Sequence, residues 1–181
     1  MLQVPPIPSW DSLHPLIIHF PIALLLVAPL FILIGVLVSP SKGRLFLASA
    51  VMLMLLGTVS LFLAVESGEA AGELADRTPP ISDVLRQHEE LATVTRNLFV
   101  GLSIIGIAVL SLPRLLSTER VLFTRVLPVS FLVFYTVGII FLVNTADRGG
   151  RLVHELGVHA VISPTTERPA AIPVRSEETG E

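Results

Sequence analysis

Residues 16–38 read LIIHFPIALLLVAPLFILIGVLV, a stretch of 23 positions without Asp, Glu, Lys or Arg. A helix needs about 20 apolar residues to cross the roughly 30 Å hydrocarbon core of a bilayer. Three further segments meet this requirement, so we predict helices over about 16–38, 45–65, 92–112 and 121–144. The sequence therefore predicts an all-α fold, a bundle of four transmembrane helices.

The composition agrees with lipid as the surrounding solvent. Of the 181 residues, 52% are hydrophobic and 15% are charged, and the mean hydropathy is +0.78. A net charge of -3 gives no basic footprint for nucleic acid. The absence of cysteine excludes disulfides, thiolate zinc sites and covalently attached c-type haem. No phosphate loop or paired nucleophile and base is present, so we do not expect an enzyme that acts on its own.

The chain divides into three parts. We expect an N-terminal segment over 1–11, the membrane domain over 12–162, and a tail over 163–181. The tail is rich in proline and acidic residues and has little to bury, so we expect it to be disordered.

The basic residues predict the sidedness of the bundle. The two short connections hold a set of Lys and Arg residues with a single acid, Glu119: Lys42, Arg44, Arg114, Arg120 and Arg125. By the positive-inside rule this side is cytoplasmic. Both termini and the long second connection are then exoplasmic, with short amphipathic segments on that side. In a Gram-negative bacterium this corresponds to an inner-membrane protein with a periplasmic face.

All five histidines fall on the exoplasmic side: His14, His19, His88, His154 and His159. His14 and His19 are five residues apart, as are His154 and His159, which is about 140° around a helix. Neither pair can bind one metal ion from a single helix face, and HELGVH lacks the spacing of a zinc-protease motif. His19 and His88 come from different helices and can face each other as axial ligands of haem b. A weaker second pairing joins His14 and His154. The alternative is that these histidines anchor the helix ends or form hydrogen bonds there.

Three prolines modify the first helix. Pro15 lies near its first turn, where a missing N–H costs little. Pro21 and Pro29 lie further in, and each removes the hydrogen bond to the carbonyl four residues earlier. We therefore expect the helix to bend, with the carbonyls of Ile17 and Leu25 in need of other partners.

The second helix continues past the membrane as AVESGEAAGELADR. A ridge of small residues at every fourth position permits close packing: Ser60, Ala64, Gly68 and Gly72. Glu66, Glu69 and Glu73 form a separate carboxylate stripe. The stripe is either a divalent-metal site with a nearby histidine or a solvated face that pairs with arginines.

The third and fourth helices carry further polar positions. A stripe on the third helix is expected to face the bundle: His88, Ala92, Thr95 and Phe99. Asn97 is expected to find an interhelical partner. Gly149 and Gly150 predict a break before a short amphipathic segment, whose Arg151 could pair with the acids of the second helix.

Three segments carry a family resemblance: LHPLIIHFPIALLLVA, RQHEELATVTRNL and GGRLVHELGVHA. With the four-span plan, the chain resembles the bacterial membrane-protein family catalogued as domain of unknown function 2231 over about residues 10–162. The matching positions are His14, Pro15, His19, Phe20, Pro21, His88, Asn97, Gly149, Gly150 and Gly157. The resemblance implies a four-helix inner-membrane protein whose relatives occur fused or adjacent to c-type cytochrome modules, and this context favours a redox role.

Three hypotheses of function follow. The first is a b-haem-binding electron-transfer subunit that works with a periplasmic c-type cytochrome. The second is a non-catalytic structural or assembly subunit of a membrane complex, in which the histidines and Glu66 form an interhelical polar network. The third is a divalent-metal sensor or transporter built from Glu66, Glu69, Glu73 and a nearby histidine.

Overall fold

A computed structural model describes residues 7–116 and 120–158, and these residues are helical apart from short connections. The elements are η1 (Trp10–Leu13), α1 (His14–Ile17), α2 (His19–Leu37), α3 (Pro40–Glu73), α4 (Pro79–Leu115), η2 (Leu122–Val126) and α5 (Leu127–His154). Four helical segments are long and apolar enough to span a membrane: Trp10–Leu37, Pro40–Glu73, Pro79–Leu115 and Leu122–His154. The four-helix membrane prediction is therefore confirmed.

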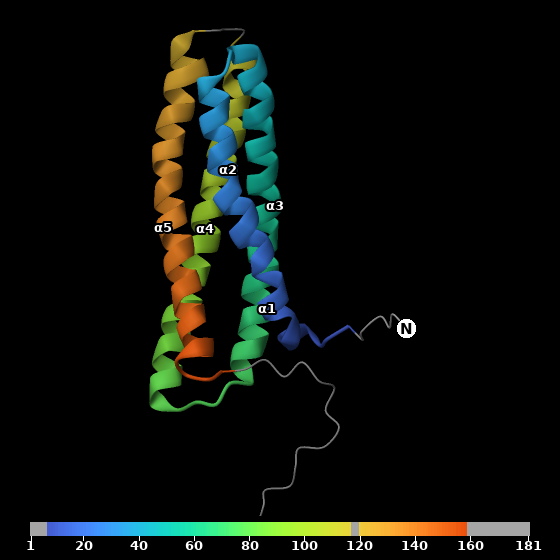
Figure 1. Cartoon of the computed structure of the whole chain (residues 1–181), viewed down its shortest axis with the longest axis vertical. Helices are drawn as coiled ribbons and strands as arrows, with labels where there is room; N and C mark the ends of the chain where they lie inside the picture. Colours follow the sequence, from blue (N-terminus) through green and yellow to red (C-terminus); the bar gives the residue numbers. More distant parts are fainter. Residues whose placement is uncertain (1–6, 117–119, 159–181) are drawn as a thin grey trace, which may run out of the picture.

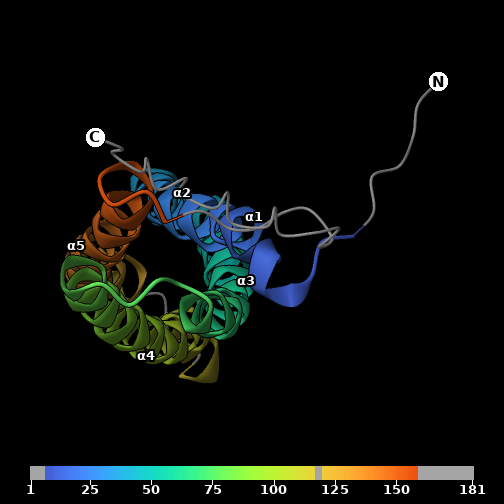
Figure 2. The same cartoon turned by 90° about the horizontal axis from the view of Figure 1, so that it is seen from below.

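The helices run up and down and form a ring. In Figure 1 η1 and α1 lie toward the lower end, whereas the end of α2, the start of α3 and the end of α4 lie at the upper end. Figure 2 looks along the bundle and shows α2, α3, α4 and α5 around one axis. α2 packs against α3 and α5, and α4 packs against α3 and α5. Toward the lower end the α4–α5 pair diverges from α1 and α3 (Figure 1).

The core takes one large side chain from each long helix. Leu25, Met54, Phe99 and Tyr135 have 0% relative exposure. The Phe99 and Tyr135 rings meet edge to face with centroids 5.6 Å apart. Apolar residues outside this core are exposed over much of the outer surface, as expected where lipid tails cover it.

Glycine allows the closest helix approach. α2 and α3 meet near their connection, where a Cβ atom on Gly43 would collide with the carbonyl oxygen of Gly35. Further along, a Cβ atom on Gly57 would lie 2.7 Å from the Leu25 side chain. These contacts follow the small-residue packing that membrane helices favour.

The prolines act at the positions that the sequence indicates. The first membrane helix is interrupted at Ile18, three residues before the buried Pro21, which cannot donate to the carbonyl of Ile17. Pro29 leaves the carbonyl of Leu25 without a helical donor, and the buried Tyr135 hydroxyl donates to this oxygen at 2.9 Å. Tyr135 of α5 therefore replaces the hydrogen bond that Pro29 removes from α2.

The expected continuation of the second helix past the membrane is confirmed, because α3 reaches Glu73. The third helix begins earlier than expected, at Pro79, so the connection between these two helices is short. α5 also continues through Gly149 and Gly150 to His154, so the expected break at this glycine pair is absent. The predicted tail and His159 lie outside the described residues.

Candidate functional site

His14 and His88 meet at the lower end of the bundle. His14 begins α1, whereas His88 lies in the third turn of α4. Their ring centroids are 6.4 Å apart, and the ring planes are 80° from parallel. Two imidazoles from opposite helix pairs thus come together where these pairs diverge.

The His14 ring is oriented by α3. Its Nδ1 lies 3.2 Å from the Ser67 hydroxyl oxygen, and Ser67 is fully buried. Ser67 uses its own hydroxyl proton to bond the carbonyl of Ala64 at 3.2 Å. When the Ser67 hydroxyl donates to Ala64, its oxygen can accept a hydrogen bond from Nδ1–H of His14, because a hydroxyl has one proton. In the neutral ring, Nε2 then carries the lone pair.

The His88 ring is oriented by α5 in the same way. Its Nδ1 lies 2.9 Å from the backbone oxygen of Thr145, which can only accept. Nδ1 therefore holds the proton, and Nε2 of the neutral ring carries the lone pair. In both rings, the hydrogen bond to the neighbouring helix is made through Nδ1.

A hydroxyl pair supports this arrangement from the side of the rings that faces the bundle core. The Thr145 hydroxyl donates to the carbonyl of Phe141 at 2.9 Å, so it accepts from the Thr95 hydroxyl at 2.8 Å. Thr95 is fully buried and belongs to the predicted inward stripe, together with the buried Phe99. The stripe prediction is therefore confirmed at these two positions.

Each imidazole packs on a glycine of the neighbouring helix. A Cβ atom on Gly68 would lie 2.8 Å from Cε1 of His14, and a Cβ atom on Gly149 would lie 2.9 Å from Cε1 of His88. A larger residue at either position requires the ring or the neighbouring helix to shift. Gly68 of the predicted small ridge thus makes room for a histidine.

The comparisons with known proteins identify a family. The model of a family described as a predicted membrane protein, DUF2231, matches residues 11–161. The chain belongs to this family. No curated protein and no solved structure matched the chain. In this DUF2231 protein the matched segment includes His14, Ser67, His88 and Thr145.

The structure changes the predicted pairing of the histidines. His14, rather than His19, lies beside His88, and His19 is exposed. His154, at the end of α5, is exposed, and within the described residues His14 makes its ring contact with His88 and not with His154. Pro15 is also exposed, at the first turn of α1.

Two further expectations were wrong. Asn97 is exposed, and its side-chain oxygen accepts a hydrogen bond from the adjacent Arg96 at 3.4 Å instead of bonding another helix. Arg151 pairs with Glu155 on its own helix at 3.0 Å and not with the acids of α3. Arg148, beside Gly149, has a buried Nε without a hydrogen-bond partner among the described residues.

The carboxylate stripe does not form a metal site in the described part of this DUF2231 protein. Glu66, Glu69 and Glu73 are all exposed, and the described residues contain no group of three or more His, Asp or Glu that could hold a metal ion. The metal hypothesis therefore gains no support. Glu66 is also outside the polar network, which consists of histidine, serine and threonine.

Sequence reasoning missed the residues that orient the two rings. Ser67 and Thr145 lie in apolar or small-residue surroundings that match no site motif. A backbone oxygen such as that of Thr145 leaves no sequence signal at all. The available signal was Gly68, one of the small residues at every fourth position of α3, which indicates that another group packs closely on this face of the helix.

Proposed function

We propose that this integral membrane protein is a b-haem-binding electron-transfer subunit, in which His14 and His88 would hold the haem. The observation that carries the proposal is the meeting of these two imidazoles, each with Nδ1 donating to a protein oxygen. Metal-binding histidines commonly donate their second ring N–H to such an oxygen, which fixes the tautomer and the ring orientation.

The separation of the two imidazoles supports this proposal, because two rings this close from different helices would be able to hold one metal ion between them. The observed separation of the His14 and His88 centroids is 6.4 Å. Arg148 adds a cationic side chain with an unpaired Nε next to the glycine that packs on His88. Such a group suits a carboxylate, and haem carries two.

The chain's own residues would hold the cofactor rigidly. Ser67 and Thr145 fix the two rings from different helices, while Gly68 and Gly149 allow them to lie against the helix backbones. When bound, a bis-histidine haem supplies reversible one-electron transfer between Fe(II) and Fe(III). Because two histidines would hold the group, this arrangement would favour electron transfer over binding of an external ligand.

The surface beside the site suits a basic electron-transfer partner. Glu66, Glu69, Glu73 and Asp76 are exposed at this end of α3 and just beyond it. Their charges would attract a basic c-type cytochrome and steer its approach. By the positive-inside rule this end faces the periplasm of a bacterial inner membrane, and a reporter fused at Lys42 should then read as cytoplasmic.

A structural or assembly subunit is the second candidate. It is favoured by the observation that Nδ1 of each imidazole already has a protein acceptor, so His14 and His88 could join α1, α3, α4 and α5 without a cofactor. In this case the hydrogen bonds of His14 and His88 would hold the four helices together at this end of a subunit of a membrane complex.

Optical spectra separate the two candidates. The wild type, purified in detergent from haem-replete cells, is compared oxidised and dithionite-reduced with His14→Ala and His88→Ala. His19→Ala and His154→Ala, which remove exposed histidines, are the matched controls. We expect a b-type spectrum that both ligand variants lose and both controls keep. A colourless but folded wild type leaves the structural subunit as the function.

A further inference from the structure

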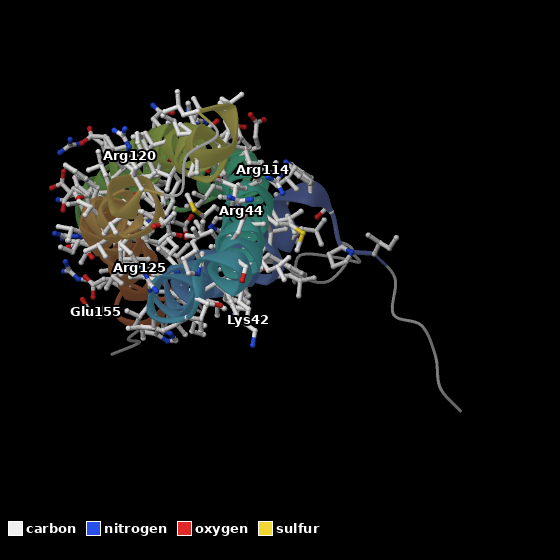
Figure 3. All side chains as sticks on the ribbon, turned by 90° about the horizontal axis from the view of Figure 1, so that it is seen from above. Lys42, Arg44, Arg114, Arg120, Arg125 and Glu155 are labelled. Atoms are coloured by element: carbon white, nitrogen blue, oxygen red, sulfur yellow. The ribbon has the colours of Figure 1, made fainter. Side chains whose placement is uncertain are left out.

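The uncharged lengths of two helices mark where the hydrocarbon core of the bilayer ends. Residues 45–65 in α3 and residues 126–146, most of them in α5, are uncharged stretches of 21 residues each. At 1.5 Å per residue each stretch is about 32 Å long, which matches the roughly 30 Å hydrocarbon core. Glu66 on α3 and Asp147 on α5 then mark the lower border. Figure 3 looks onto the upper end and shows the basic side chains around the other border: Lys42, Arg44, Arg114, Arg120 and Arg125.

The start of α1 is level with the lower border. Nδ1 of His14 lies 3.2 Å from the Ser67 hydroxyl oxygen, and Ser67 directly follows Glu66 in α3. η1 comes directly before His14 and packs against α3. Figures 1 and 2 show η1 beside α1 and α3, outside the ring of long helices. η1 therefore lies at the depth of the lipid headgroups, on the outer surface of the bundle.

The segment 7–13 has one side against the protein and large apolar side chains on its open side. Ser12 is buried, and its hydroxyl oxygen lies 3.0 Å from that of Ser9 across the turn. Trp10 is 44% exposed, and Ile7, just before η1, is 89% exposed. Asp11 is the single charged residue of this segment. Two large apolar side chains are therefore open at the depth of the headgroups, on a segment that α3 holds in place.

We propose that residues 7–13 form an interfacial anchor, which lies in the headgroup layer with the Trp10 indole among neutral phospholipids. Tryptophan is enriched at membrane–water interfaces, because its ring is apolar and its N–H can donate to polar groups there. A segment with one acid and no base has no electrostatic attraction to anionic lipid, so neutral phospholipid is the expected partner. The anchor holds the start of α1, and with it His14, at the membrane surface. The proposal rests on the membrane spans and is independent of haem.

Fluorescence quenching tests the anchor in the unmodified protein, because Trp10 is the single tryptophan of the chain. The full chain is reconstituted in phosphatidylcholine nanodiscs whose acyl chains carry bromine close to the headgroup, bromine close to the chain end, or no bromine. Acrylamide measures access to the indole from water. Two control variants move the indole in a Trp10→Phe background. Phe20→Trp places it on the exposed outer surface of α2, and Leu74→Trp places it beyond the border, at the exposed end of α3.

We expect bromine close to the headgroup to quench Trp10 about twofold more than bromine close to the chain end. The indole of Phe20→Trp should be quenched more by the deeper bromine than Trp10 is, and that of Leu74→Trp by acrylamide alone. Quenching of Trp10 by acrylamide without any effect of bromine, as in Leu74→Trp, would place the indole in water and overturn the proposal. Resistance of Trp10 to both quenchers would mean that protein covers it, and this result would contradict a lipid anchor.

Discussion

Gly149 and Gly150 are neighbours in α5 with opposite surroundings, and this makes a sharp prediction. An alanine Cβ at position 149 would lie 2.9 Å from Cε1 of His88, whereas at position 150 nothing lies within 4 Å. Either change gains about 0.8–1 kcal/mol of helix propensity. Gly149→Ala must also push the His88 ring off the Thr145 oxygen, which costs about 0.5–1.5 kcal/mol for the hydrogen bond and more for displaced packing. We expect Gly149→Ala to be less stable than Gly150→Ala by about 1–2 kcal/mol.

Reversible unfolding in mixed detergent micelles measures the free energies of unfolding of Gly149→Ala and Gly150→Ala. The difference between these two values should disappear in a His88→Ala background, because the alanine at position 149 then contacts no ring. A double-mutant cycle isolates this coupling. Equal stability of Gly149→Ala and Gly150→Ala in the wild-type background would refute the packing of His88 on Gly149. A difference that survives His88→Ala would mean that the cost comes from another contact.

Two buried hydrogen bonds make further predictions for the same unfolding assay. Tyr135→Phe leaves the Leu25 carbonyl without a donor and should cost about 1–3 kcal/mol. In a Pro29→Ala background the backbone N–H of residue 29 can donate to the Leu25 carbonyl again, so Tyr135→Phe should lower the free energy of unfolding by less. An equal loss in both backgrounds would contradict the view that Tyr135 replaces the hydrogen bond that Pro29 removes. Thr58→Val breaks the 2.9 Å bond to the Ser103 hydroxyl and should cost about 0.5–1.5 kcal/mol, so an unchanged stability would show that the pair contributes nothing.

The membrane helices could be predicted because lipid imposes simple requirements. Length and apolarity locate the four spans. The missing N–H groups of Pro21 and Pro29 locate the two carbonyls, of Ile17 and Leu25, that lose their helical donor. The inward stripe through Thr95 and Phe99 also follows from helical spacing. Each of these features depends on residues that are close together in the sequence, so each can be predicted without knowing how the helices pack.

The candidate site depends on how helices meet, and this explains the errors. The spacing of His14 and His19 indicates that they point in different directions, but which of them faces His88 depends on how α1 packs against α3 and α4. Gly149 and Gly150 look like a helix break in isolation, yet packing on His88 gives Gly149 a role inside a continuous helix. Asn97 is exposed on α4, and the hydrogen bond that it accepts comes from the adjacent Arg96 and not from another helix.

Ligand rescue tests the central claim, that His14 and His88 together bind one haem. Optical spectra of His14→Ala and His88→Ala are recorded with and without added imidazole after haem reconstitution, with His19→Ala as the control. The account predicts that each ligand variant loses the low-spin b-type spectrum, that imidazole restores it in both, and that the control needs no rescue. A wild type that binds no haem, or a spectrum that depends on His19 and not on His14, would contradict it.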